Sequence, residues 1–135
     1  MPPSSDTDQQ EVLIRVAADT GVYPIEAYQF LERGLGYTVA KVHGAAPVEG
    51  QDRHVSGQEL CHGLREYALH QWGLLAQTVL RCWNITSTYD FGRIVFILAE
   101  HKIMRTSATD SIDDFRNVFN FKTEFVSSYR ITSKL

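Results

Sequence analysis

The pattern of hydrophobic and polar positions along the chain predicts an all-α fold of five to six helices. The clearest helix spans residues 57–71, where apolar side chains recur at the spacing of one helix face. Its apolar face carries Leu60, Cys61, Leu64, Tyr67 and Ala68. Ser56 and Glu59 form a capping-box sequence in front of this helix, in which each side chain accepts a hydrogen bond from the other residue's backbone N–H. Gly73 marks its end.

Two further helices follow, over residues 74–83 and 91–101. The first has one apolar face, made of Leu75, Val79, Cys82 and Trp83. Because Cys82 lies on this face and Cys61 on the apolar face of the preceding helix, both are predicted to be buried thiols. The second helix is apolar all round at residues 94–98, which is typical of a central, buried helix.

Nearer the start of the chain, the pattern predicts a helix over residues 8–18 and another from Ile25 onward, separated by a turn. The inward-facing residues are Val12, Leu13 and Val16 in the first helix and Tyr28, Leu31 and Leu35 in the second. Gly34 and Gly36 are expected to weaken the end of the second helix. Residues 37–43 fit either more helix or a short strand, and the apolar spacing favours helix.

We assign the whole chain, residues 1–135, to a single domain. Residues 1–7 are polar and proline-rich, and we expect them to form a disordered tail. Asp110 is expected to cap a helix that runs through Phe119. Residues 121–135 are expected to add one or two helical turns that dock on the core through aromatic side chains.

The chain contains an internal repeat, in which residues 12–31 align with residues 78–97 without a gap. The identical pairs are Arg15 with Arg81, Thr20 with Thr86, Tyr23 with Tyr89 and Phe30 with Phe96. The predicted helices and the turn also agree between the two stretches. The sequence therefore predicts a duplicated helical hairpin whose copies pack together, with the helix 57–71 inserted between them.

A resemblance to a known family rests on the words HVSGQEL, GLREYA and DFGRIVF, and on the spacing of Gly73, Ala76, Val79, Leu80 and Trp83. These features resemble a family of small uncharacterised bacterial repeat proteins, best represented in planctomycete-like lineages. The resemblance covers roughly residues 20–130. It implies a bacterial, self-standing protein and supports the repeat, but it implies no activity, cofactor, partner or functional residue.

Composition excludes several function classes. The chain is 44% hydrophobic and 21% charged, as ordinary globular proteins are. It has no apolar run long enough to span a bilayer and no secretory signal pattern, so we expect a cytoplasmic protein without membrane partners. A net charge of −3 argues against general nucleic-acid binding.

The sharpest candidate for chemistry is the polar face of the helix 57–71, made of Glu59, His62, Glu66 and His70. These side chains lie within about 80° of one another around the helix, and Glu-x-x-His is a ligand pair in di-iron helical bundles. Such bundles need two of these motifs and two further glutamates, whereas this chain has one motif. The alternative is a solvated polar face of the kind that any surface helix shows, so we assign no metal and no cofactor.

Basic side chains form a second candidate, for binding an anion. His54 stands just before the start of the helix 57–71, where backbone N–H groups favour an anion. Arg93, Lys102 and Arg105 surround the end of the helix 91–101, although a helix C-terminus favours cations in any case. We assign no catalytic residue, because no nucleophile elbow and no phosphate-binding glycine loop occur.

The sequence thus favours a small interaction protein over an enzyme. We expect it to bind another protein through a groove between the two hairpins. Two alternatives stay open: a metal-binding protein that uses the Glu/His face, and a nucleic-acid or ribosome-associated factor.

Overall fold

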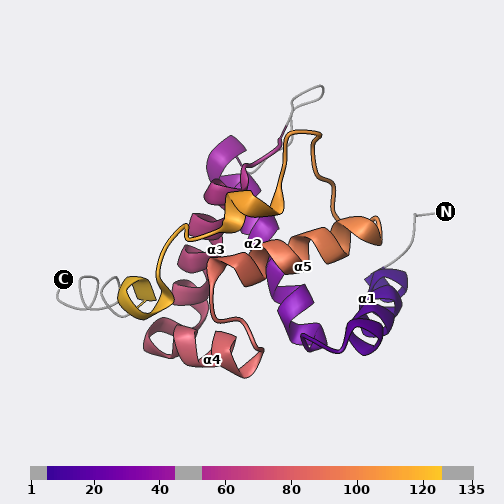
Figure 1. The fold of residues 1–135 in the computed structure, drawn as a ribbon, viewed down its shortest axis with the longest axis horizontal. Coiled ribbons are helices and arrows are strands. Elements are labelled where there is room, and N and C mark those ends of the chain that lie inside the picture. Colours follow the sequence, from indigo (N-terminus) through magenta and orange to yellow (C-terminus); the bar gives the residue numbers. More distant parts are fainter. Residues whose placement is uncertain (1–5, 45–52, 126–135) are drawn as a thin grey trace.

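The computed structural model describes residues 6–44 and 53–125, which are helical with no strand among them (Figure 1), and this confirms the predicted all-α class. The elements in chain order are α1 (Asp6–Thr20), α2 (Ile25–His43), α3 (Gly57–Trp72), the 3-10 helix η1 (Gly73–Leu75), α4 (Ala76–Cys82), α5 (Thr88–Glu100) and the 3-10 helix η2 (Ile112–Phe115). Residues 121–125 form a further helical turn. No described helix is both long and apolar enough to cross a membrane.

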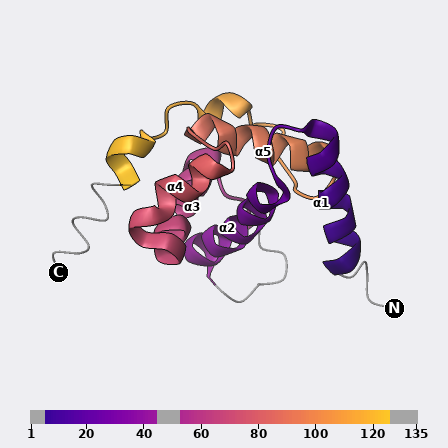
Figure 2. The same ribbon diagram turned by 90° about the horizontal axis from the view of Figure 1, so that it is seen from below.

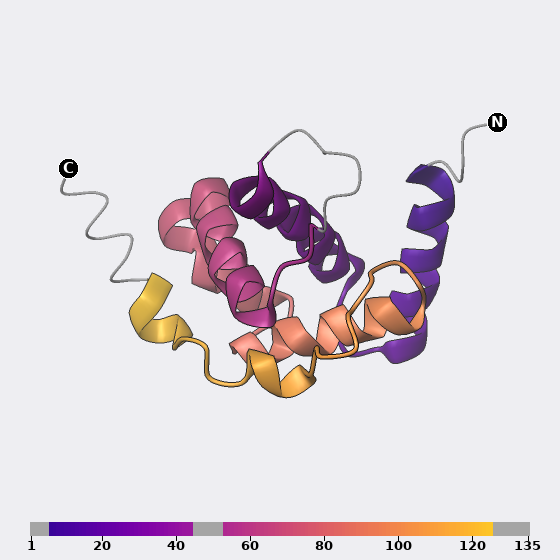
Figure 3. The same ribbon diagram turned by 90° about the horizontal axis from the view of Figure 1, so that it is seen from above.

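Helices α2 and α3 pack against each other, and α5 packs across both of them. Helix α1 packs on α2 at one end of the molecule, while α4 and the turn 121–125 lie at the opposite end (Figures 1 and 2). Figure 3 shows η2 following the outer side of α5. The core lies where α2, α3 and α5 meet, around Leu31, Leu64 and Ile94, none of which is exposed to solvent. The predicted central burial of α5 is confirmed by Ile94 and Leu98.

Both predicted ends of α3 are confirmed. The Glu59 N–H donates to the Ser56 hydroxyl at 3.0 Å, and the Ser56 N–H donates to the Glu59 carboxylate at 2.8 Å. Gly73 follows the last residue of α3 with a φ of 52°, a conformation that glycine adopts without strain. Helix α5 begins with a second capping box, formed by Ser87 and Asp90.

Helix α2 continues to His43, so the expectation that Gly34 and Gly36 weaken its end was wrong. Residues 37–43 are helical, and the alternative of a short strand there is excluded. Glycine lowers the helix propensity of an isolated segment by about 1 kcal/mol relative to alanine. Contacts with α3 override that local preference.

Two glycines bring α2 and α3 close together. A Cβ atom at Gly34 would lie 2.2 Å from Cδ2 of Leu64, and one at Gly63 would lie 1.9 Å from Oγ1 of Thr38. Each helix therefore has a missing side chain where the other presents a bulky one. The Thr38 hydroxyl also donates to the Gly34 carbonyl at 2.7 Å, which satisfies a buried polar group.

The helix predicted over residues 74–83 is shorter, and the face that it turns to the core is a neighbouring one. Ala76 and Leu80 are buried, whereas Leu75 is 62% exposed and Cys82 is exposed. The predicted burial of Leu75 and Cys82 was therefore wrong, whereas Trp83 packs against the core, with its ring 6.0 Å from the Phe30 ring. The 3-10 turn η1 precedes α4 and changes the rotation of the helix, which a continuous helical pattern cannot anticipate.

The helix predicted to run from Asp110 through Phe119 is replaced by the single 3-10 turn η2. Ser111, not Asp110, caps this turn. Arg116 is extended, with a ψ of 127°, so the helical path ends directly after Phe115, and Asn117 follows with a φ of 50° in the left-handed region. The predicted docking of the last segment is confirmed for residues 121–125, where Phe121 and Phe125 are buried.

The predicted tail 1–7 is shorter than expected, because Asp6 and Thr7 belong to α1. Acidic residues are favoured in the first turn of a helix, so this extension is consistent with the sequence. The rest of that tail, residues 1–5, and residues 126–135 of the last segment lie outside the described residues.

The two stretches of the predicted repeat both fold as helix, turn and helix. Residues 12–31 lie in α1 and α2, and residues 78–97 lie in α4 and α5. Helix α3 comes between them in the chain and packs on both α2 and α5. Their packing differs, since α1 packs on α2 whereas α4 packs on α3. A duplication stays a prediction of the sequence.

Polar bonds join the turn between α1 and α2 to the turn between α4 and α5. The Tyr23 hydroxyl donates to Oδ1 of Asp90 at 2.5 Å, and the Asn84 side-chain amide donates to the Val22 carbonyl at 3.2 Å. The other carboxylate oxygen of Asp90 accepts the backbone N–H of Thr86 at 2.9 Å. Asp90 thereby caps α5 and ties it to the first hairpin through one buried carboxylate.

Candidate functional site

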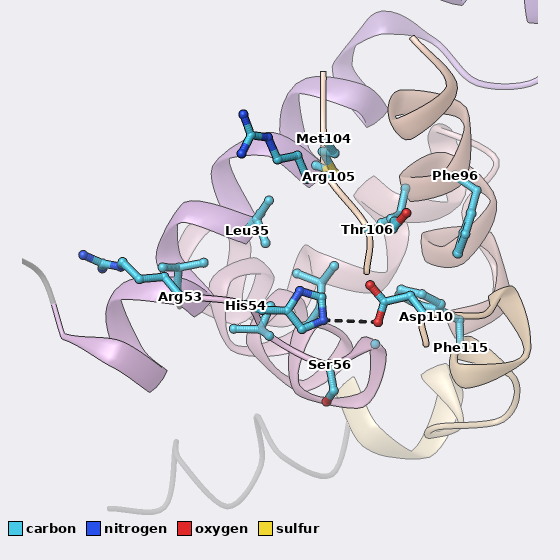
Figure 4. A pocket seen from close by; sticks show the side chains of 15 residues that line it. Leu35, Arg53, His54, Ser56, Phe96, Met104, Arg105, Thr106, Asp110 and Phe115 are labelled. Carbon is cyan, nitrogen blue, oxygen red and sulfur yellow. Dashed lines mark hydrogen bonds and ion pairs between the residues drawn. The ribbon is translucent and has the colours of Figure 1, made fainter. Parts of the chain in front are cut away.

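A cavity of about 450 Å³ opens between α2, the start of α3, α5 and the connector that leads to η2 (Figure 4). Ligand pockets in proteins commonly occupy about 300–1,000 Å³. One part of the lining, the apolar wall, consists of Leu35, Val39, Val55, Leu60, Val95, Phe96, Met104 and Phe115. The other part, the polar rim, consists of Arg53, His54, Ser56, Arg105, Thr106 and Asp110.

The apolar wall draws on helices that are far apart in the chain. Leu35 and Val39 stand one turn apart on α2, and Val95 and Phe96 lie on α5. Val39 reaches the cavity only because α2 continues as a helix beyond its two glycines. The wall therefore depends on the close packing of α2 against α3.

Phe115 closes the cavity from the side of η2. The Thr88 hydroxyl at the start of α5 donates to the Phe115 carbonyl at 2.6 Å. Gly92 lets the ring approach, because a Cβ atom there would lie 2.7 Å from Cβ of Phe115. The position of this aromatic side chain is thus set by α5 and not by η2 alone.

A hydrogen bond joins two segments of the polar rim. Nε2 of His54 lies 3.1 Å from Oδ1 of Asp110, and Figure 4 shows the two side chains facing each other. The other carboxylate oxygen of Asp110 accepts the Ser107 N–H at 2.7 Å. His43 at the end of α2 donates from Nε2 to the His54 carbonyl at 2.7 Å. The linker before α3 and the connector after α5 are consequently held together at the rim.

Positive charge on the polar rim is not balanced by carboxylates of the described residues. Arg105 is exposed and makes no hydrogen bond or ion pair with any residue that the structure describes. Arg53 donates to the Gly44 carbonyl, which carries no net charge. Asp110 is the single acidic residue among the described lining residues, and it is paired with His54.

The structure brings together half of the predicted basic group. His54 and Arg105 both belong to the polar rim, whereas Arg93 and Lys102 do not line the cavity. Arg93 lies near the start of α5, with Nη1 3.7 Å from Oδ1 of Asp90. Sequence reasoning did not select Arg53 as a site residue, although its position next to His54 was a usable signal.

The side chains of the predicted Glu/His face on α3 each contact a different part of the molecule. Glu59 caps α3, and Glu66 accepts hydrogen bonds from Lys41 and from the Tyr37 hydroxyl, the latter at 3.1 Å. Burial raises the pKa of Glu66, but the bonds from Lys41 and Tyr37 outweigh burial and leave the pKa below its usual value.

The two histidines of this face pack on different aromatic rings. The His62 ring lies 5.7 Å from the Phe119 ring, and the His70 ring lies 5.9 Å from the Tyr37 ring, measured between centroids. Within residues 6–44 and 53–125, no three His, Cys, Asp or Glu side chains are grouped so that they could hold a metal ion. The described structure therefore offers no further ligands to complete this face as a metal site.

Comparison of the chain with protein-family models, curated protein sequences and solved structures gives no match. The cavity is accordingly the feature on which a function can be argued.

Proposed function

We propose that the protein is a non-enzymatic interaction module whose cavity receives apolar side chains of a partner protein. The observation that supports this proposal is the apolar wall, which is built from α2 of the first hairpin and α5 of the second and is open to solvent. Covering such a surface contributes roughly 25 cal/mol for each Å² of apolar area removed from water. A partner side chain in the cavity gains this energy without unfolding any element.

The polar rim suits binding better than catalysis. The His54 imidazole is engaged with Asp110, and the Ser56 hydroxyl accepts the capping hydrogen bond of α3. A nucleophile needs a base within hydrogen-bond reach, and these two groups are instead paired with residues of the scaffold. The expected cytoplasmic location, without membrane or nucleic-acid partners, belongs to the same proposal.

Filling the cavity tests the proposal. Thr106 lies on the exposed connector and lines the cavity, so a Thr106→Trp substitution occupies the binding space from outside the core. Ala108→Trp is the matched control, because Ala108 is an exposed residue of the same connector that does not line the cavity. Random peptides displayed on phage are selected on the full chain, and their affinities for both variants are then measured.

We expect the selected peptides to bind Thr106→Trp at least about tenfold more weakly than the unchanged chain, a difference of ~1.4 kcal/mol. Binding to Ala108→Trp should be unchanged. Failure to select any peptide, or equal binding to Thr106→Trp, would contradict the proposed function. Circular dichroism of both variants verifies that they are folded.

A further inference from the structure

We infer that the partner segment is acidic, with its apolar side chains in the cavity and its carboxylates at the polar rim, on the side that carries Arg105 and Arg53. This inference rests on the proposed function and specifies the chemistry of the partner. It follows from the charge of the rim, from the backbone hydrogen bonds beside Arg105, and from the position of the two arginines beside an apolar surface.

The backbone at Arg105 is held in place by its neighbour. Met104 is buried in the apolar wall with 6% of its surface exposed, and its N–H donates to the Leu98 carbonyl at 3.3 Å. The N–H of Ile103 donates to the same carbonyl at 2.9 Å. Arg105 therefore extends from a fixed position after the end of α5, while its guanidinium group has no partner among the described residues.

Arg53 lies in a different segment, the linker between α2 and α3. Its hydrogen bond to the Gly44 carbonyl orients the guanidinium group, and no carboxylate within residues 6–44 and 53–125 is paired with it. Figure 4 shows the guanidinium groups of Arg53 and Arg105 on the same side of the cavity, next to α2. Two cations from separate segments thus flank one edge of the apolar wall.

The remaining charge on the rim does not cancel these cations. Asp110 is the single carboxylate among the described lining residues, and it faces His54. The rim is therefore net positive even when His54 is neutral. This local positive charge stands in a chain whose overall charge is −3.

A carboxylate is the group that matches this arrangement. Guanidinium groups bind carboxylates through paired, charge-assisted hydrogen bonds, and such bonds are stronger next to an apolar surface than in open water. Aspartate or glutamate beside a large apolar residue supplies both halves of the chemistry in one segment. Rim charges mainly raise the association rate and the specificity, so the binding should weaken as salt is added.

The test uses the same selection on the full chain, with two charge-reversal variants. Arg105→Glu changes the rim, and Arg81→Glu is the matched control, since Arg81 is an exposed residue of α4 that does not line the cavity. We expect the selected peptides to combine Asp or Glu with large apolar residues. We also expect their affinity to fall about tenfold with Arg105→Glu and to stay unchanged with Arg81→Glu.

The outcomes separate this inference from the proposed function. Peptides that lack acidic residues, bind Arg105→Glu normally and lose affinity for Thr106→Trp would overturn the acidic partner and leave the interaction module standing. If no peptide is selected, both proposals fail. If the selected peptides are acidic but bind Arg105→Glu with unchanged affinity, the assignment of the carboxylate to this rim is also refuted.

Discussion

Cys61 and Cys82 have the same side chain and a similar place in the apolar pattern, yet they end in opposite environments. Cys61 is fully buried in α3, and burial raises the pKa of its thiol to about 12. Cys82 is exposed on α4. Since the thiolate is the reactive form, the two residues should differ strongly in reactivity.

We predict that a thiol reagent such as Ellman's reagent modifies Cys82 rapidly in the native protein and modifies Cys61 only after unfolding. Cys82→Ser should remove the rapid phase, and Cys61→Ser should leave it intact. The measurement is the rise in absorbance over time as the reagent releases its coloured product, with and without denaturant. Equal, rapid modification of both thiols in the folded protein would contradict the buried position of Cys61.

At the residue scale, what could be predicted from the sequence depends on how far each partner lies along the chain. The capping box of Ser56 and Glu59 was predictable, because the two residues are three positions apart and cap each other. The exposure of Cys82 was not, because it depends on the rotation that η1 imposes on α4. The packing of Phe115 against Gly92 joins residues that no local pattern connects.

At the scale of helices, the contact between α2 and α3 depends on glycine for space. Gly63 faces Thr38, whereas Gly36 on α2 is exposed and a Cβ atom there would meet nothing within 4 Å. Both glycines therefore lie within helices, but Gly63 is tightly packed and Gly36 is open to solvent. Replacing each with alanine separates the effect of helix propensity on stability from the effect of packing.

We predict that Gly63→Ala lowers the free energy of unfolding by about 1–3 kcal/mol, because the new methyl group collides with Thr38. Gly36→Ala should instead raise it by about 0.5–1 kcal/mol, since alanine favours helix and nothing obstructs the methyl group. Urea unfolding followed by circular dichroism measures both values. The close approach of the helices is refuted if Gly63→Ala is as stable as the unchanged chain.

The same contact explains why the length of α2 escaped the sequence pattern. Two glycines in three residues indicate a weak helix end when judged locally. The interaction that keeps the helix intact is made with α3, whose side chain Leu64 fills the space over Gly34. Local propensity was therefore a sound guide for the ends of α3 and a poor one for the end of α2.

At the scale of the whole molecule, the hydrogen bond from Tyr23 to Asp90 joins the two hairpins. Burial and the bond to Asp90 raise the pKa of the Tyr23 hydroxyl above its usual value of 10. The unfolded chain releases this proton near pH 10, whereas the folded chain retains it. The stability contributed by Tyr23 is thus complete below pH 10 and falls as the pH rises above that value.

We predict that Tyr23→Phe lowers the free energy of unfolding at neutral pH by about 1–3 kcal/mol, because it leaves the buried Asp90 without one of its donors. Tyr28→Phe, which removes a bond to the Thr20 hydroxyl within the first hairpin, should cost less, about 0.5–1.5 kcal/mol. Urea unfolding at pH 7 and above pH 10 measures both. If Tyr23→Phe lowered the free energy of unfolding more above pH 10 than at pH 7, the direction of the pKa shift would be contradicted.

The candidate site shows the same division between local and distant information. His54 and Arg105 were predictable as basic candidates, since one precedes a helix and the other follows one. The cavity that they share was not, because its walls come from segments that are far apart in the chain. The Glu/His face on α3 was a regular local pattern, yet its side chains contact Lys41, Tyr37 and Phe119.

The position of the cavity along the chain has a consequence for biosynthesis. Its first wall residue is Leu35 and its last is Phe115, so a growing polypeptide on the ribosome cannot complete the cavity until nearly all of the described residues have emerged. A partner that occupies it would bind the finished fold alone and stabilise that fold by about 2.7 kcal/mol at a hundredfold excess over its dissociation constant. Occupancy would thus favour chains that have been synthesised beyond Phe115 over shorter ones.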